Sequence, residues 1–151
     1  RLLFPVKIPV GQVANLSPDA DAPPPPMRIL YVDDDPALRD VVGSLLGADG
    51  HTVEVADGGQ AGIDAFRAAR ERGDPFETVI TDLGMPDVDG RQVARAVKAD
   101  SPDTPVILLT GWGAKMKAEG DLPEQVDVIL SKPVKVAEIR RALKGLEPQR
   151  H

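Results

Sequence analysis

Short apolar runs alternate with longer amphipathic stretches along most of the chain, beginning at Met27. Each apolar run has the length of a strand. The stretch after the first run carries its apolar residues at the helical period, at Leu38, Val41, Val42, Leu45 and Leu46. Strand and helix in regular alternation predict an α/β domain with a parallel sheet and helices on both faces.

The pattern predicts five strands, separated or followed by helices. The strands in chain order are Arg28–Val32, Thr52–Ala56, Thr78–Thr81, Val106–Leu109 and Val128–Leu130. Asp35 suits the N-cap of the first helix, and Pro36 suits its first position. Later helices are expected from about Gln60 to Arg72, around Val93–Val97, and from Val136 to Leu146.

Two strands differ in apolar content, which predicts their places in the sheet. Thr52–Ala56 alternates polar and apolar residues, which is typical of an edge strand. Val106–Leu109 is continuously apolar and suits a central, buried position. Between Gly111 and Gln125, several glycines and Pro123 leave room for about two helical turns at most, so this is the weakest predicted element.

The composition changes before this alternation begins. Residues 1–10 read as one strand interrupted by prolines, and we interpret them as the remnant of a preceding domain. Residues 11–26 are polar and end in four consecutive prolines, which favours an extended linker. The rest divides into one domain at 27–147 and a tail at 148–151, because 151 residues suffice for one buried core and hardly for two.

Composition and charge exclude several classes of protein. The chain has no cysteine, which excludes disulfide frameworks and thiolate metal sites, and a cytoplasmic location is expected. The net charge of −6 argues against direct nucleic-acid binding, which depends on clustered lysine and arginine. No apolar run is long enough to cross a bilayer, so no membrane contact is expected of this segment.

Polar residues stand where four of the five predicted strands end. They are Asp33 and Asp34 after the first strand, Asp82 after the third, Thr110 after the fourth, and Lys132 just beyond the fifth. In an open parallel sheet, ligands bind outside the carboxyl ends of the strands. We therefore expect these side chains to form one site.

The carboxylates at this edge point to a metal. Three carboxylates placed together repel one another; either a raised pKa or a bound divalent cation resolves the repulsion, and the cation is preferred here. Oxygen ligands without histidine or cysteine select Mg²⁺, while Lys132 supplies positive charge for an anion. No glycine-rich loop follows the first strand, which excludes the usual nucleotide cradle. Asp82 is then the best-placed nucleophile toward a phosphoryl donor.

Four motifs at these strand ends closely resemble the response-regulator receiver family. They are ILYVDDDP at 29–36, ITDLGMP at 80–86 with Asp89-Gly90, LTG at 109–111 and LSKP at 130–133. The resemblance covers residues from about Met27 to Leu146, with the motifs in order and at the expected spacing. It implies a doubly wound five-stranded parallel sheet with the flavodoxin-like strand order 2-1-3-4-5 and helices on both faces.

The resemblance also implies roles for individual residues. Asp82 would accept a phosphoryl group from a histidine kinase or a phosphotransfer protein. Magnesium would lie among Asp33, Asp34, Asp82 and the Gly84 carbonyl. Such a domain catalyses only its own phosphorylation and dephosphorylation, and it then switches conformation; whether it does so as a homodimer is left open.

Signal transmission departs from the family pattern. The resemblance implies that Thr110 and Lys132 contact the phosphoryl oxygens and that the Lys132–Pro133 bond is cis. Many receivers carry Tyr or Phe three residues before the lysine, as a switch ring that swings inward, and Ile129 occupies that position here. Transmission is therefore expected through Thr110 and the loop after it. Trp112 in this loop is interpreted as a packing residue.

The order of segments resembles that of hybrid sensor histidine kinases. Residues 1–10 resemble the closing strand of a kinase ATP-binding domain, which in hybrid kinases precedes a proline-rich linker and a C-terminal receiver. We therefore interpret the chain as the receiver end of such a kinase. No output domain follows Leu146, so a one-chain transcription factor is not expected.

Two other functions compete with phosphoacceptance. A pseudo-receiver would keep the fold and bind partners without phosphorylation, but Asp82 and the residues around it are all intact. A metal-dependent phosphatase usually needs a second acid two residues after its nucleophile, and Gly84 stands there instead. The two histidines, His51 and His151, show no ligand pattern. The receiver function is therefore preferred.

Overall fold

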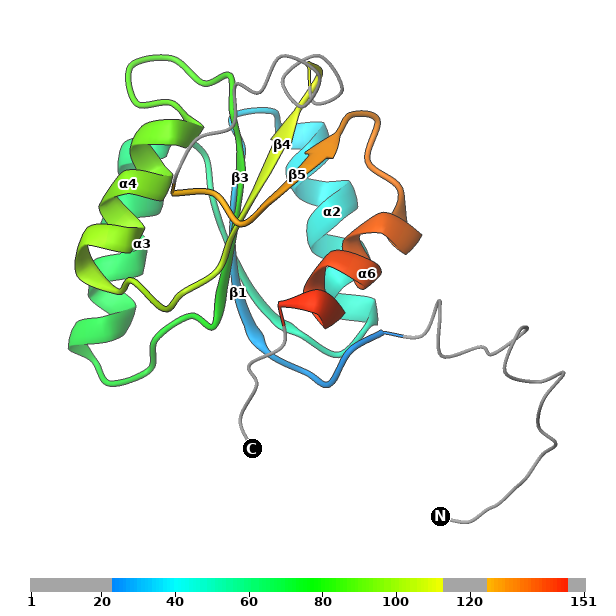
Figure 1. Cartoon of the computed structure of the whole chain (residues 1–151), viewed down its shortest axis with the longest axis horizontal. Coiled ribbons are helices and arrows are strands. Elements are labelled where there is room, and N and C mark those ends of the chain that lie inside the picture. Colours follow the sequence, from blue (N-terminus) through cyan, green and yellow to red (C-terminus); the bar gives the residue numbers. More distant parts are fainter. Residues whose placement is uncertain (1–22, 113–124, 147–151) are drawn as a thin grey trace, which may run out of the picture.

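The computed structural model of the chain describes residues 23–112 and 125–146 (Figure 1). Its strands are β1 (Arg28–Val32), β2 (Thr52–Ala56), β3 (Thr78–Asp82), β4 (Val106–Thr110) and β5 (Val128–Ser131). Its helices are α2 (Pro36–Ala48), α3 (Gly59–Glu71), α4 (Gly90–Asp100) and α6 (Val136–Gly145). All the strands predicted within these residues are present, and their ends differ from the predictions by one residue or less.

The strands form one parallel sheet in the order β2-β1-β3-β4-β5, which confirms the predicted fold. Figure 1 shows α3 and α4 on one face of the sheet and α2 and α6 on the other. Alternate residues of each strand therefore pack on different helices. Leu30 and Val32 join the cluster under α3 and α4, while Ile29 and Tyr31 join the one under α2 and α6.

The predicted places of two strands are also confirmed. β2 lies at the edge of the sheet, and most of its residues are exposed or half-buried. β4 lies between β3 and β5, and all of its residues are buried. A strand covered on both faces is largely apolar, because unpaired polar side chains are costly to bury.

The helices differ in how their first turns are capped. The Asp35 carboxylate accepts from the Ala37 amide at the start of α2, as predicted, and Pro36 follows it. Asp89 and Gln92 form a reciprocal capping box at the start of α4. Lys135 precedes α6 and provides no side-chain cap. The N-terminus of α6 is thus the least well fixed of these three.

Ion pairs gather at the end of the sheet where strands begin. Arg28 contacts Asp74 at 3.1 Å, Lys98 contacts Asp127 at 2.8 Å, and Arg140 contacts Asp49 at 2.7 Å. Each of these carboxylates precedes a strand. The end where the strands finish is left for the polar residues that the sequence singled out.

Some sequence predictions lie outside the described residues. They concern the strand at 1–10, most of the linker at 11–26, the short helix between Gly111 and Gln125, and the tail at 148–151. Among the helices that the structure describes, none combines the length and the apolar character that crossing a bilayer requires.

Candidate functional site

The carboxyl ends of β1, β3, β4 and β5 bring the predicted site residues together. Carboxylate oxygens of Asp33, Asp34 and Asp82 all lie within 4.8 Å of one another. The Lys132 ammonium lies 2.6 Å from Asp82 Oδ1. The Lys132 amide also donates to the Thr110 carbonyl at 2.9 Å, which holds the end of β5 beside the end of β4. Strand order alone thus assembles a site from distant segments.

Asp82 lies at the base of this site and is 5% exposed. Burial raises the pKa of Asp82 above its ordinary value; the hydrogen bond from Lys132 opposes the rise, and the neighbouring Asp33 and Asp34 add to it. The ammonium therefore offsets part of the cost of a carboxylate held among other carboxylates. A nucleophile beside a cation, at the end of a buried strand, is suited to attack a phosphoryl donor.

Asp33 and Asp34 have different surroundings. Asp33 is fully buried, and each of its carboxylate oxygens accepts one hydrogen bond: Oδ2 from the Tyr31 hydroxyl at 2.6 Å and Oδ1 from the Asp35 amide at 2.9 Å. Asp34 is exposed. Burial, followed by the bond to Asp33, raises the pKa of Tyr31 far above its ordinary value, so the phenol stays protonated as a donor.

Thr110 ends β4 and is 3% exposed. Its hydroxyl oxygen accepts a hydrogen bond from the Trp112 amide at 3.0 Å, so the side chain is tied to the loop that follows it. Trp112 itself is 69% exposed. The interpretation of Trp112 as a packing residue was wrong, because the loop after β4 leaves most of this side chain in contact with solvent.

Tight packing fixes the loop between β3 and α4. The Leu83 amide donates to the Leu109 carbonyl, and the Gly90 amide donates to the Leu83 carbonyl, both at 2.9 Å. A Cβ atom on Gly90 would collide with the backbone carbonyl of Asp82 and with the side chain of Leu108. Gly90 therefore allows α4 to start directly against the strand end that carries Asp82. Gly84 is exposed in this loop.

The segment from Ile129 to Pro133 adds two features. Ile129 is 5% exposed and packs with Leu83 and Leu108, so an aliphatic side chain fills the position where many receivers have a ring. The Lys132–Pro133 peptide bond is cis, the isomer that the resemblance implies.

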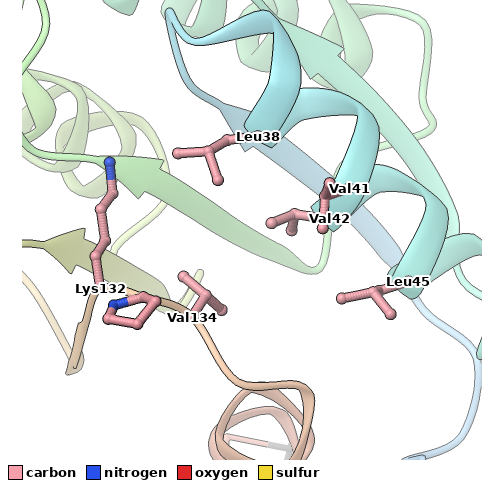
Figure 2. Close-up of a pocket in the computed structure, with 7 residues that line it drawn as sticks. Leu38, Val41, Val42, Leu45, Lys132 and Val134 are labelled. Carbon is pink, nitrogen blue, oxygen red and sulfur yellow. The ribbon is translucent and has the colours of Figure 1, made fainter.

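An apolar groove adjoins the site (Figure 2). It has a volume of about 460 Å³. Side chains of α2 line one wall, and Figure 2 shows Lys132 and Val134 across from them. Val41 on the α2 wall is 55% exposed, although it is large and apolar. Lys132 belongs both to this groove and to the acidic site.

Two features of the site region were missed in the sequence. Tyr31 was read only as a strand residue, although a phenol among aliphatic residues, two positions before a buried carboxylate, is a signal for a hydrogen bond on the same face of the strand. The groove gave no local signal, because its walls come from segments far apart in the sequence.

Comparison with known proteins agrees with this arrangement. The family model described as the response regulator receiver domain matches residues 29–144. The transcriptional regulatory protein TrcR of Mycobacterium tuberculosis is 35% identical over 121 residues, which are 80% of this chain and 45% of that protein. The chain thus spans about half the length of the curated relatives it matches.

Solved structures share the fold. A response regulator receiver domain protein from Clostridium thermocellum superposes with a TM-score of 0.69 at 30% identity, over 80% of this chain and 93% of that one. The receiver domain of the sensor histidine kinase PA1611 from Pseudomonas aeruginosa, solved with a magnesium ion in its active-site cleft, gives 0.67 at 28% identity over 80% and 96%. With its motifs, sheet order and family match in agreement, the chain belongs to the response regulator receiver domain family of two-component signal transduction.

Proposed function

We propose that Asp82 is the phosphoacceptor of this receiver, and that it takes its phosphoryl group from a phosphohistidine on a histidine kinase or phosphotransfer protein. The observation that carries the proposal is the position of Asp82: it is buried at a strand end, 2.6 Å from an ammonium and close to two further carboxylates. No other carboxylate of the acidic site shares that combination.

The acidic site fits a magnesium ion. Its donors are carboxylate oxygens from three residues with no histidine or cysteine among them, which suits a hard cation. Asp33, Asp34 and Asp82 would hold the ion, together with the Gly84 carbonyl. When bound, Mg²⁺ supplies positive charge that offsets the negative charge of the phosphoryl oxygens.

The residues of the chain account for the transfer itself. An oxygen of Asp82 forms a bond to phosphorus, the nitrogen–phosphorus bond of the donor breaks, and its electron pair stays on the imidazole nitrogen. Lys132 and the Thr110 hydroxyl would stabilise the phosphoryl oxygens. Hydrolysis of the resulting acyl phosphate by water returns the free carboxylate and releases inorganic phosphate, so the domain catalyses only its own phosphorylation and dephosphorylation.

We assign the groove beside Lys132 to docking of the phosphodonor. A donor that brings its imidazole to Asp82 must cover the adjacent surface, and Lys132 belongs to both places. The exposed Val41 and its neighbours would bury apolar area against a helix of the donor. Val41→Asp should slow phosphorylation by a donor protein at least tenfold and leave phosphorylation by acetyl phosphate unchanged.

We further propose that this receiver belongs to a hybrid sensor histidine kinase. The proline-rich segment before the domain supports this context. So does the structural likeness to the receiver of the sensor histidine kinase PA1611. The relative TrcR, a transcriptional regulatory protein, represents the alternative context. Autophosphorylation of the full-length gene product on histidine with ATP would distinguish the two.

Intact-mass measurement tests phosphoacceptance directly. The wild-type chain incubated with acetyl phosphate and Mg²⁺ should gain one phosphoryl mass, and the gain should disappear with EDTA. Asp82→Asn should show no gain, because an amide does not attack phosphorus, while Asp34→Asn should retain a reduced one. A wild-type chain that gains no mass would favour a phosphorylation-independent binding module instead.

A further inference from the structure

The ring of Tyr31 is ordinary core, but its hydroxyl is not needed for packing. Tyr31 is fully buried in β1, opposite Val55 on β2 and Ile80 on β3, and its ring belongs to the apolar cluster under α2 and α6. A phenylalanine would bury nearly the same surface. The hydroxyl adds one contact, the 2.6 Å hydrogen bond to Asp33 Oδ2.

That contact fixes a group at the candidate metal site. Asp33 comes directly after β1 and is fully buried, so its carboxylate orientation depends on the donors around it. The Tyr31 hydroxyl holds one oxygen, and the Asp35 amide holds the other at 2.9 Å. Two donors on two different oxygens define the carboxylate plane, while each oxygen keeps a further lone pair. The short distance from the hydroxyl is typical of a bond to an ionised acceptor.

We propose that Tyr31 is a positioning residue, which orients the Asp33 carboxylate for Mg²⁺ from beneath the site. The proposal rests on the proposed function, because it assumes that Asp33 is a magnesium ligand. Partners that hydrogen-bond to ligating carboxylates commonly change metal affinity by about 10- to 100-fold when removed. The exposed Asp34 receives no such support from two residues earlier in the chain. Val32 stands there, and its apolar side chain packs in the α3 and α4 cluster and offers no hydrogen bond.

Isothermal titration with MgCl₂ tests the proposal on the whole chain. Tyr31→Phe removes the hydroxyl and keeps the ring, and it should weaken Mg²⁺ binding about tenfold. Ile139→Val is the matched control, because Ile139 belongs to the same buried cluster but lies on α6 rather than on β1. Ile139→Val should lower the melting temperature about as much as Tyr31→Phe does, and it should leave Mg²⁺ affinity unchanged.

A double-mutant cycle separates positioning from a general loss of packing. In an Asp33→Asn background, Tyr31→Phe should change Mg²⁺ affinity by less than about twofold, because the group through which it acts is already altered. A wild-type chain that binds no Mg²⁺ would overturn both this proposal and the proposed function. Wild-type binding together with equal affinity in Tyr31→Phe, or the same loss in both backgrounds, would overturn the role of Tyr31 alone.

Discussion

Asp33 and Asp34 are neighbours in the sequence, yet replacing them should have different effects on stability. Asp34→Ala removes an exposed like charge beside Asp82, so the melting temperature should stay the same or rise. Asp33→Ala leaves the buried hydroxyl of Tyr31 without its acceptor, and should lower the free energy of unfolding by about 1–3 kcal/mol. Urea unfolding of the two variants measures both effects.

Both variants should also lose Mg²⁺ affinity, which calorimetry would show. Equal changes in stability would contradict the distinction between the buried and the exposed carboxylate. Asp33 and Asp34 differ in burial, and the sequence alone does not reveal this difference between two adjacent aspartates.

His51 provides a pH-dependent contribution away from the site. It is 6% exposed, and its Nδ1 accepts from the Met27 amide at 3.1 Å. Burial lowers the pKa of His51, although Asp49 and Glu77 oppose the shift. Below the unfolded pKa of about 6.5, the unfolded chain binds a proton that the folded chain resists, so stability should fall as the pH drops from about 7 to 5.5.

A substitution isolates this contribution. His51→Asn offers an amide oxygen to the Met27 amide but no titratable group. Its free energy of unfolding should decline less over the same pH range than that of the wild type, as thermal or urea unfolding at several pH values would show. Parallel pH profiles would mean that other groups cause the decline. The sequence did not reveal this structural role, because the hydrogen bond joins His51 to a residue 24 positions earlier in the chain.

At the scale of elements, the junction of β3 and α4 depends on one missing side chain. Gly90→Ala places a methyl group against the Asp82 carbonyl, and this backbone oxygen cannot easily move away. The variant should lose about 1–3 kcal/mol of stability. It should also be phosphorylated more slowly, because the displaced carbonyl belongs to Asp82 itself. Gly47→Ala in α2 is the control, since a Cβ atom there would meet nothing beyond its own helix backbone within 4 Å. Unchanged phosphorylation in a destabilised Gly90→Ala chain would separate α4 from the site.

The loop after β4 carries its own reporter. The Trp112 amide is bonded to the Thr110 hydroxyl, and the residue is largely exposed. If Thr110 turns toward a phosphoryl oxygen, that hydrogen bond must break and the loop must shift. Tryptophan emission should therefore change when Mg²⁺ and beryllofluoride, a phosphoryl mimic, are added together.

Two variants assign this change. Thr110→Ala should remove most of the emission response, whereas Ile129→Val should preserve it, because no ring is available at 129 to swing inward. If mass measurement shows that the chain accepts a phosphoryl group but tryptophan emission does not change with beryllofluoride, the conformational change takes place on another face of the domain.

At the scale of the whole molecule, the sequence predicted what depends on local pattern. Strand and helix order, the edge position of β2 and the burial of β4 follow from apolar content, and the motifs at strand ends located Asp82 and Lys132 correctly at one edge. What was missed depends on contacts between distant segments or on fine exposure. Examples are the exposure of Trp112 and the groove between α2 and the loop before α6.

The uncapped start of α6 has a consequence for local opening. Without a side-chain cap, and with Ile139 and Leu143 as its buried residues, α6 should detach at a lower free energy than the central strands unfold. Hydrogen exchange should then show faster amide exchange in α6 than in β1 and β3. Lys132 lies just before α6, while Asp33 directly follows β1 and Asp82 is the last residue of β3. The Lys132 ammonium would thus belong to the part of the molecule that opens more easily, and the Asp33 and Asp82 carboxylates to the part that opens last.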